Sequence, residues 1–68
     1  MENLGKSIKM RRKALSITQR ELAALSGVSI NTLTKMERGE ANPSIKVVDT
    51  ILKTLGLEMD IRIRIPNI

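Results

Sequence analysis

The hydrophobic and polar positions of the chain follow two different periods. From residue 3 to residue 55 the apolar side chains recur every three or four positions, which is the spacing of one face of an α-helix. From residue 57 to residue 65 they recur at every second position, which is the spacing of a β-strand. The pattern therefore predicts a helical body followed by one C-terminal strand.

Four helical segments are predicted in the body from this spacing and from the residues that begin and end helices. Thr18 stands three positions before Glu21, which is the sequence of a capping box at a helix start. Serines cap the next two helices, and a glycine ends each of the last three because it takes a left-handed conformation without strain. The predicted segments are 3–15, 18–27, 29–39 and 44–56.

The tail is predicted to pair with a second copy of the chain. A lone strand leaves its backbone N–H and C=O groups unpaired, which costs free energy when they are half buried. Soluble oligomers are mostly two-fold symmetric, so we expect a homodimer with antiparallel strands centred on Ile61. In that register Glu58 faces Arg64 of the other copy and Asp60 faces Arg62. The strand consists of Leu57, Glu58, Met59, Asp60, Ile61, Arg62, Ile63, Arg64 and Ile65.

Residues 18–39 have the pattern of two short helices joined by a tight turn at Gly27. Ala23 is small where the two helices must approach each other, and apolar contacts are expected from Leu22, Val28, Leu33 and Met36. The outer face of the second helix carries Asn31, Thr34, Lys35 and Arg38, with Ile30 beside them. This is the pattern of a helix-turn-helix whose second helix is free to enter a DNA major groove.

Composition excludes most other kinds of chemistry. The 68 residues contain no His, no Cys and no aromatic residue, which removes imidazole bases, thiol nucleophiles, zinc sites built from these ligands and stacking platforms for single-stranded bases. No apolar run reaches membrane-spanning length, and no signal peptide is evident. We expect a cytoplasmic, nucleoid-associated binding module that is not an enzyme and uses no cofactor or metal.

The net charge of +5 lies entirely in the first half of the chain. Residues 1–38 carry eight basic and three acidic side chains, whereas residues 39–68 carry four of each. A basic half beside an electroneutral half indicates that the first half binds a polyanion and the second has another role. A chain of this length without disulfides also has a small core, for which dimerisation is the usual supplement.

The segment T-Q-R-E-L-A-x-x-S-G-V-S-x-x-T-L-x-x-M-E-R-G at residues 18–39 resembles the Cro and phage-repressor (XRE-like) helix-turn-helix family. The resemblance covers about residues 4–56 and implies an all-α, lambda-repressor-like domain of four to five helices. The tail L-G-L-E-M-D-I-R-I-R-I resembles HipB-type antitoxins, in which a C-terminal strand of each protomer pairs with its mate. We therefore expect a DNA-binding domain at 1–56 and a dimerisation strand and tail at 57–68.

Several side chains are candidates for contacts with the DNA backbone. Gln19 lies at the start of the second helix, where free N–H groups and the helix dipole favour a phosphate. The resemblance implies that Gln19 contacts phosphate and braces the recognition helix, while an ordinary solvated first-turn residue is the alternative. The resemblance also pairs Arg12 with Glu37 as a structural ion pair beside a phosphate. Arg38 and, through its backbone N–H, Ser44 are the other phosphate candidates.

Five residues at the head and on the outer stripe of the third helix are candidates for reading bases: Ser29, Ile30, Asn31, Thr34 and Lys35. Asn31 can pair with adenine through two hydrogen bonds, and Ile30 or the methyl group of Thr34 can contact a thymine methyl group. Lys35 can reach guanine or a phosphate. Ser29 is equally compatible with a role as a helix cap alone, and Ile30 with that of an ordinary exposed apolar residue.

These expectations describe a homodimeric repressor whose two recognition helices enter successive major grooves of an inverted-repeat operator in double-stranded DNA. The HipB resemblance implies an autoregulating antitoxin with a HipA-like toxin kinase as its protein partner. Two alternatives stay open. One is a stand-alone or phage-like repressor without a toxin, and the other is a protein-interaction module that neutralises a partner without binding DNA.

Overall fold

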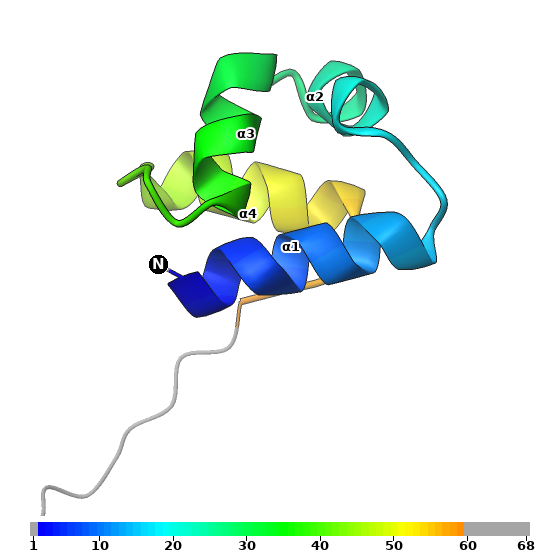
Figure 1. Ribbon diagram of the computed structural model, residues 1–68, viewed down its shortest axis with the longest axis horizontal. Helices are drawn as coiled ribbons and strands as arrows, with labels where there is room; N and C mark the ends of the chain where they lie inside the picture. The colour runs from blue at the N-terminus through cyan, green and yellow to red at the C-terminus, as the bar shows by residue number, and fades with distance from the viewer. Residues whose placement is uncertain (1, 60–68) are drawn as a thin grey trace, which may run out of the picture.

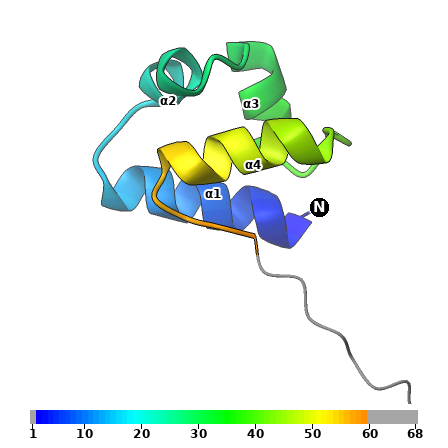
Figure 2. The ribbon, with the colours of Figure 1, turned by 180° about the vertical axis from the view of Figure 1, so that it is seen from behind.

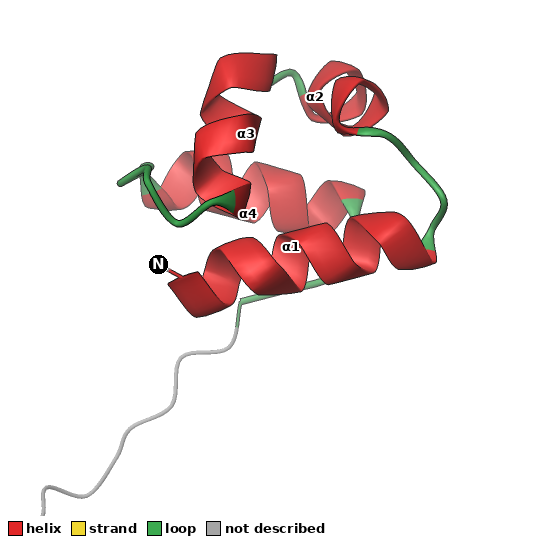
Figure 3. Cartoon of the chain, in the orientation of Figure 1, coloured by secondary structure: helices red, strands yellow, loops and turns green. Residues whose placement is uncertain are grey.

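The computed structural model describes residues 2–59, which form four α-helices and their connections (Figure 1). The helices are α1 (Glu2–Ala14), α2 (Gln19–Ser26), α3 (Ile30–Glu37) and α4 (Ile45–Thr54). The third helix packs against α1 and α2, and α2 also packs against α4. Only helices and loops occur in this part of the chain (Figure 3), so the predicted all-α class is confirmed.

The residues that were predicted to cap the starts of α2, α3 and α4 all do so. At α2 the Thr18 hydroxyl accepts a hydrogen bond from the Glu21 backbone N–H at 3.0 Å, and the Glu21 carboxylate accepts one from the Thr18 N–H at 3.0 Å. This reciprocal pair satisfies N–H groups that have no partner inside the helix. Ser29 and Ser44 cap α3 and α4 through their side-chain oxygens.

The end of α2 depends on the backbone freedom of glycine. Gly27 has a φ of +72°, in the left-handed region, and Val28 N–H then donates to Ala23 C=O at 3.1 Å. That bond satisfies a carbonyl of the last turn and directs the chain toward α3. Gly39 and Gly56 also have positive φ angles, as expected from their places after helices.

The end of α1 differs from the prediction. The spacing predicts a helix that runs to Leu15, but α1 ends at Ala14 and Leu15 is 42% exposed. Ser16 takes the left-handed conformation, with a φ of +59°, and Ile17 N–H donates to Arg12 C=O at 3.2 Å. α1 therefore ends before Ser16, in the manner of a helix that ends at a left-handed residue, and Leu15 lies after its last helical residue.

The core contains residues from all four helices. Ile8 of α1, Leu22 of α2 and Leu33 of α3 are completely buried, and each contributes about 1.5–3 kcal/mol of hydrophobic free energy relative to an exposed side chain. The full set of buried apolar residues is Ile8, Leu22, Ala23, Leu33, Met36, Val48, Ile51, Leu52 and Leu55. The core thus fixes α3 from one side and leaves its other side to solvent.

The C-terminal segment turns back along α1 after α4 (Figure 2). Leu57 packs against the core, and residues 57–59 adopt no regular secondary structure. Strand hydrogen bonds require a second strand, and residues 2–59 of one chain supply none. The other residues of the predicted strand, 60–65, lie outside the described residues, so strand pairing and the division at residue 56 remain predictions.

Candidate nucleic-acid interface

α3 presents two chemically different faces. Its inward side consists of Leu33, Met36 and Glu37, which are buried. Its outward side carries exposed residues that were predicted to contact DNA. These are Ile30, Asn31, Lys35 and, at the C-cap, Arg38. A helix held by one face with polar side chains on the other has the form needed to lie in a major groove.

Two of the predicted base-reading residues already have partners within the chain. The Ser29 hydroxyl accepts from Thr32 N–H at 3.2 Å and donates to the Thr32 hydroxyl at 2.9 Å. The Thr34 hydroxyl is half-buried and donates to the Gln19 side-chain carbonyl at 3.5 Å. Within residues 2–59 the side chains of Asn31 and Lys35 make no hydrogen bond or ion pair. Of the five predicted base-reading residues, Asn31 and Lys35 are therefore the two whose polar side chains are free in the described part of the chain.

A buried ion pair joins α1 to the end of α3. Arg12 Nε donates to Glu37 Oε2 at 2.7 Å, and Arg12 Nη2 donates to Glu37 Oε1 at 3.0 Å. Arg12 is 8% exposed and Glu37 is 9% exposed. The third nitrogen, Nη1, donates to Ile17 C=O at 2.9 Å. This guanidinium therefore holds both the end of α3 and the turn before α2.

Gln19 extends this network from α1 to α2. Its side-chain nitrogen donates to Glu37 Oε1 at 3.1 Å, while its side-chain oxygen accepts from Thr34. Both ends of the amide therefore contact α3, which is the bracing role that the resemblance implies. Together, Arg12, Gln19 and Glu37 connect the first three helices through side-chain hydrogen bonds.

The network shifts the pKa of Glu37 below its ordinary value. Burial of the carboxyl raises this pKa, but hydrogen bonds from Arg12 and Gln19 and the positive charges of Arg12 and Lys9 lower it by more. The hydrogen bond with Glu37 also raises the pKa of Arg12. Glu37 is therefore a carboxylate in the folded protein at neutral pH.

This lowered pKa predicts a loss of stability in acid. Because the folded protein binds the Glu37 proton more weakly than the unfolded chain, stability is full above the unfolded pKa of about 4.3 and falls as pH drops through the folded value. Urea unfolding between pH 2 and pH 7 measures the effect. Glu37→Gln is expected to flatten the acid slope, whereas Glu40→Gln, an exposed control, should keep it. A residual slope is expected from Glu21, whose pKa is lowered by hydrogen bonds from Thr18.

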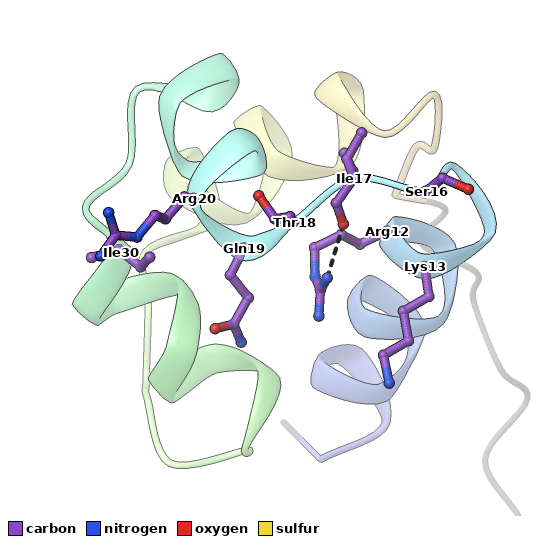
Figure 4. A pocket seen from close by; sticks show the side chains of 8 residues that line it. All are labelled: Arg12, Lys13, Ser16, Ile17, Thr18, Gln19, Arg20 and Ile30. Carbon is purple, nitrogen blue, oxygen red and sulfur yellow. Dashed lines mark hydrogen bonds between the residues drawn. The ribbon is translucent and has the colours of Figure 1, made fainter.

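An open concavity of about 590 Å³ lies between the end of α1 and the starts of α2 and α3 (Figure 4). Arg20 and Ile30 lie on one side of it, Lys13 on the other, and Gln19 projects between them (Figure 4). Lys13 and Arg20 are exposed and, within residues 2–59, have no acidic partner. The complete lining is Arg12, Lys13, Ser16, Ile17, Thr18, Gln19, Arg20 and Ile30. The concavity is therefore basic, at the edge of the exposed face of α3.

The other two phosphate candidates, Arg38 and Ser44, do not line this concavity. Ser44 is exposed, and its side-chain oxygen accepts from Val47 N–H at 3.2 Å, so its hydroxyl caps α4. Arg38 is exposed at the C-cap of α3.

In the described part of the chain no three acidic side chains gather as metal ligands would. No helix in this part is both long and apolar enough to cross a membrane.

Two residues that the sequence did not single out join α1 to the ends of other helices. Gly5 is buried where α1 meets the end of α3, and a Cβ there would clash with the Met36 carbonyl oxygen and lie 3.0 Å from that of Glu37. Arg11 Nε donates to Leu55 C=O, at the end of α4, at 2.9 Å. A glycine inside a helix was the only sequence signal for the first contact, and nothing indicated the second.

Comparison with known proteins agrees with this geometry. Residues 8–61 match the family model described as Helix-turn-helix. An uncharacterised HTH-type transcriptional regulator of Methanothermobacter thermautotrophicus is 39% identical over 51 residues, covering 75% of this chain and 74% of that protein. Antitoxin PezA of Streptococcus pneumoniae is 40% identical over 54 residues, covering 79% of this chain. The chain spans about a third (34%) of the length of PezA.

Among solved structures, the clp gene regulator ClgR of Corynebacterium glutamicum has a similar fold. The superposition has a TM-score of 0.79 with 33% sequence identity, and it covers 84% of this chain and 73% of ClgR. The arrangement of the helices is thus shared over most of both chains.

Proposed function

Because this chain belongs to the helix-turn-helix family, as the match over residues 8–61 shows, we propose that it is a DNA-binding transcriptional regulator. The observation that carries this proposal is the division of α3 into a buried face and an exposed face. Leu33, Met36 and Glu37 hold the helix in the domain, while Ile30, Asn31 and Lys35 face solvent. α3 can therefore enter the major groove of double-stranded DNA without rearrangement of the core.

Each exposed group of α3 has a chemistry suited to base edges. The Asn31 amide can donate to and accept from adenine, Lys35 can donate to guanine, and Ile30 can contact a thymine methyl group. Ser29 and Thr34 can join them by releasing or sharing their present hydrogen bonds. We assign the first rank to Asn31 because its amide has no partner within residues 2–59 and can both donate to and accept from one base.

The basic concavity is suited to the phosphates that flank the groove. Lys13 and Arg20 supply positive charge on its two sides, and the start of α2 supplies the positive end of a helix dipole. Arg12 and Gln19 are already bonded to Glu37, so their contribution is to hold this geometry as well as to approach a phosphate. Arg38 and Ser44 are assigned to phosphates on neighbouring edges of the interface.

The readout assignment predicts two different losses of DNA affinity. Asn31→Ala is expected to relax base preference at one position of each half-site, at a cost of about 1–3 kcal/mol if both hydrogen bonds form. Gln19→Ala is expected to weaken binding to all sequences by a similar factor. Selection from a random-sequence duplex pool, followed by binding titrations, measures both. Identical sequence preferences for wild type and Asn31→Ala would contradict the assignment.

We further propose that the regulator is a homodimer on an inverted-repeat operator, joined through residues 57–65. Alternating apolar and charged residues support this, because only the antiparallel register centred on Ile61 opposes unlike charges throughout. In a cell such a protein works in the cytoplasm, at the nucleoid.

The register makes a charge-exchange prediction. A basic variant, Glu58→Lys with Asp60→Lys, and an acidic variant, Arg62→Glu with Arg64→Glu, should each dimerise and bind operator more weakly than wild type. Mixing the two variants should restore dimers, because every cross-strand pair then again joins unlike charges. Each pair contributes only about 0.2–1 kcal/mol and is screened by salt, so the mixture is measured at low salt. Sedimentation and operator titrations measure both effects. Unchanged dimerisation of each variant alone would contradict this register.

The biological role that we propose is autorepression by an antitoxin, with a HipA-like toxin kinase as protein partner. The similarity to antitoxin PezA supports the antitoxin role. A regulator without a toxin is the alternative, and the similarity to the clp gene regulator ClgR favours it. A search for a kinase-like reading frame beside the gene separates these two roles.

Salt dependence separates both regulator roles from a protein-interaction module. DNA affinity that depends on several phosphates falls steeply as salt concentration rises, whereas an apolar protein interface responds little. We expect a steep linear fall of the logarithm of DNA affinity with the logarithm of salt concentration. A protein that bound no duplex at low salt would be an interaction module instead.

A further inference from the structure

Arg11 holds the point at which the chain leaves α4. Its Nε donates to the Leu55 carbonyl oxygen at 2.9 Å, and a Cβ built on Gly56 would lie 3.5 Å from its Nη2. Leu55 is the C-cap of α4 and is 1% exposed. A cation is favourable there, because the last carbonyls of a helix lack internal partners and carry partial negative charge. The contact thus joins α1 to the end of α4, 44 residues away.

The direction of the following segment is set at the same place. Gly56 has a φ of +73°, and Leu57 N–H donates to Leu52 C=O at 2.7 Å. The Leu57 side chain packs against the core, and the segment then passes along α1 (Figure 2). Arg11 therefore lies at the bend where the helical body becomes the tail.

The neighbouring residue of α1 holds the recognition helix. Arg12 bonds to Glu37 at the end of α3, whereas Arg11 bonds to Leu55 at the end of α4. Two consecutive arginines of α1 thus bond to two different places, Arg12 to the end of α3 and Arg11 to the residue where the tail leaves α4. These two bonds therefore connect the end of α3 to the exit of the tail through α1, beside the packing of α2 against both α3 and α4.

We propose that Arg11 is a positioning residue that sets the distance and angle between the two recognition helices of the dimer. This inference rests on the proposed homodimer through residues 57–65. When the tails of two copies pair, the direction in which each leaves its domain decides where the two α3 helices lie. A fixed exit direction selects one separation of half-sites on DNA, because each added base pair moves a half-site by about 3.4 Å and about a tenth of a turn.

The first experiment measures the preferred separation of half-sites. The probes are duplexes carrying two inverted copies of the half-site that wild type selects from a random pool, with the spacing changed one base pair at a time. Arg11→Met keeps the apolar stem and removes the donor. Wild type should prefer one spacing by about tenfold or more, and Arg11→Met should reduce this preference to about threefold or less, because the bond that holds the exit of the tail is lost.

Two matched variants separate positioning from general effects. Lys6→Met removes the same charge from an exposed site on α1 and should keep the wild-type spacing preference. Arg11→Lys keeps a charged donor and should restore most of that preference. All variants are compared at a temperature where circular dichroism shows them folded. If Arg11→Met and Lys6→Met had the same spacing preference, the inference would be overturned while the proposed function stood.

The second experiment needs no DNA. Amide hydrogen exchange at Leu57 should be about tenfold faster in Arg11→Met than in Lys6→Met, while exchange at Ile51 inside α4 should be unchanged. Equal exchange rates at Leu57 in these two variants would show that Arg11 does not hold the segment. A wild type without any spacing preference would instead overturn the proposed dimer on an inverted repeat, and the exchange rate would still decide whether Arg11 holds the exit.

Discussion

Replacing Glu37 by alanine is expected to lower the free energy of unfolding by about 3–5 kcal/mol, because it leaves the buried Arg12 guanidinium without its counter-charge. The side chain of Glu37 is only 3% exposed, so water cannot replace the lost carboxylate. The Gln19 amide loses its acceptor at the same time. A domain of this size has a total stability of only about 5–10 kcal/mol, so the variant should be largely unfolded in mild denaturant.

Urea unfolding of the single variant, a double variant and a control measures this effect. Arg12→Met combined with Glu37→Met removes both charges together and should be more stable than Glu37→Ala, although Ile17 C=O then loses the hydrogen bond from Arg12. The matched control is Asp49→Ala, which breaks the exposed ion pair with Lys53 and should cost less than about 1 kcal/mol. Equal costs for Glu37→Ala and Asp49→Ala would show that burial of the first pair has no energetic consequence.

Gly5→Ala is expected to destabilise the domain by about 1–3 kcal/mol, the usual cost of forcing an extra carbon into a packed site. Helix propensity alone predicts the opposite sign, since alanine is favoured over glycine inside a helix by about 1 kcal/mol. The added Cβ would meet the carbonyl oxygens of Met36 and Glu37, and backbone atoms cannot rotate away as a side chain can. The start of α1 must therefore separate from the end of α3.

Gly27→Ala provides the matched control for this prediction. A Cβ at Gly27 meets nothing within 4 Å, but the φ of +72° places alanine in the left-handed region, which costs about 1–2 kcal/mol. Gly27→Ala should therefore reduce stability without shifting the backbone NMR signals of Met36 and Glu37, whereas Gly5→Ala should do both. A stabilised Gly5→Ala variant would show that α1 and α3 can move apart freely.

The features that sequence could predict are those set by neighbouring residues. The Thr18–Glu21 capping box needs two side chains three positions apart, and Gly27 needs only its own missing Cβ, so both follow from local chemistry. The exposed stripe of α3 follows from the 3.6-residue period of a helix.

The features that could not be predicted depend on residues brought together by the fold. The bond from Arg11 to Leu55 and the close approach of Gly5 to α3 each join distant positions in the chain. Ser16 follows α1 in a left-handed conformation that more often belongs to glycine, so the helix ends one residue before the end that the sequence predicts. The engagement of Thr34 with Gln19 likewise required the packing of α2 against α3.

On the proposed reading of DNA by α3, its division into a buried and an exposed face makes the binding specificity exchangeable. Substitutions at exposed positions without structural contacts change stability by less than about 0.5 kcal/mol. Asn31 and Lys35 are such positions, and Ile30, beside them, is 40% exposed. A library randomised at these three sites should therefore consist mostly of folded proteins with altered sequence preferences. Thr34 limits that freedom, because its hydroxyl bonds to Gln19 and a change there would also disturb α2. New operators are thus most accessible to this domain through substitutions at the head and outer edge of one helix.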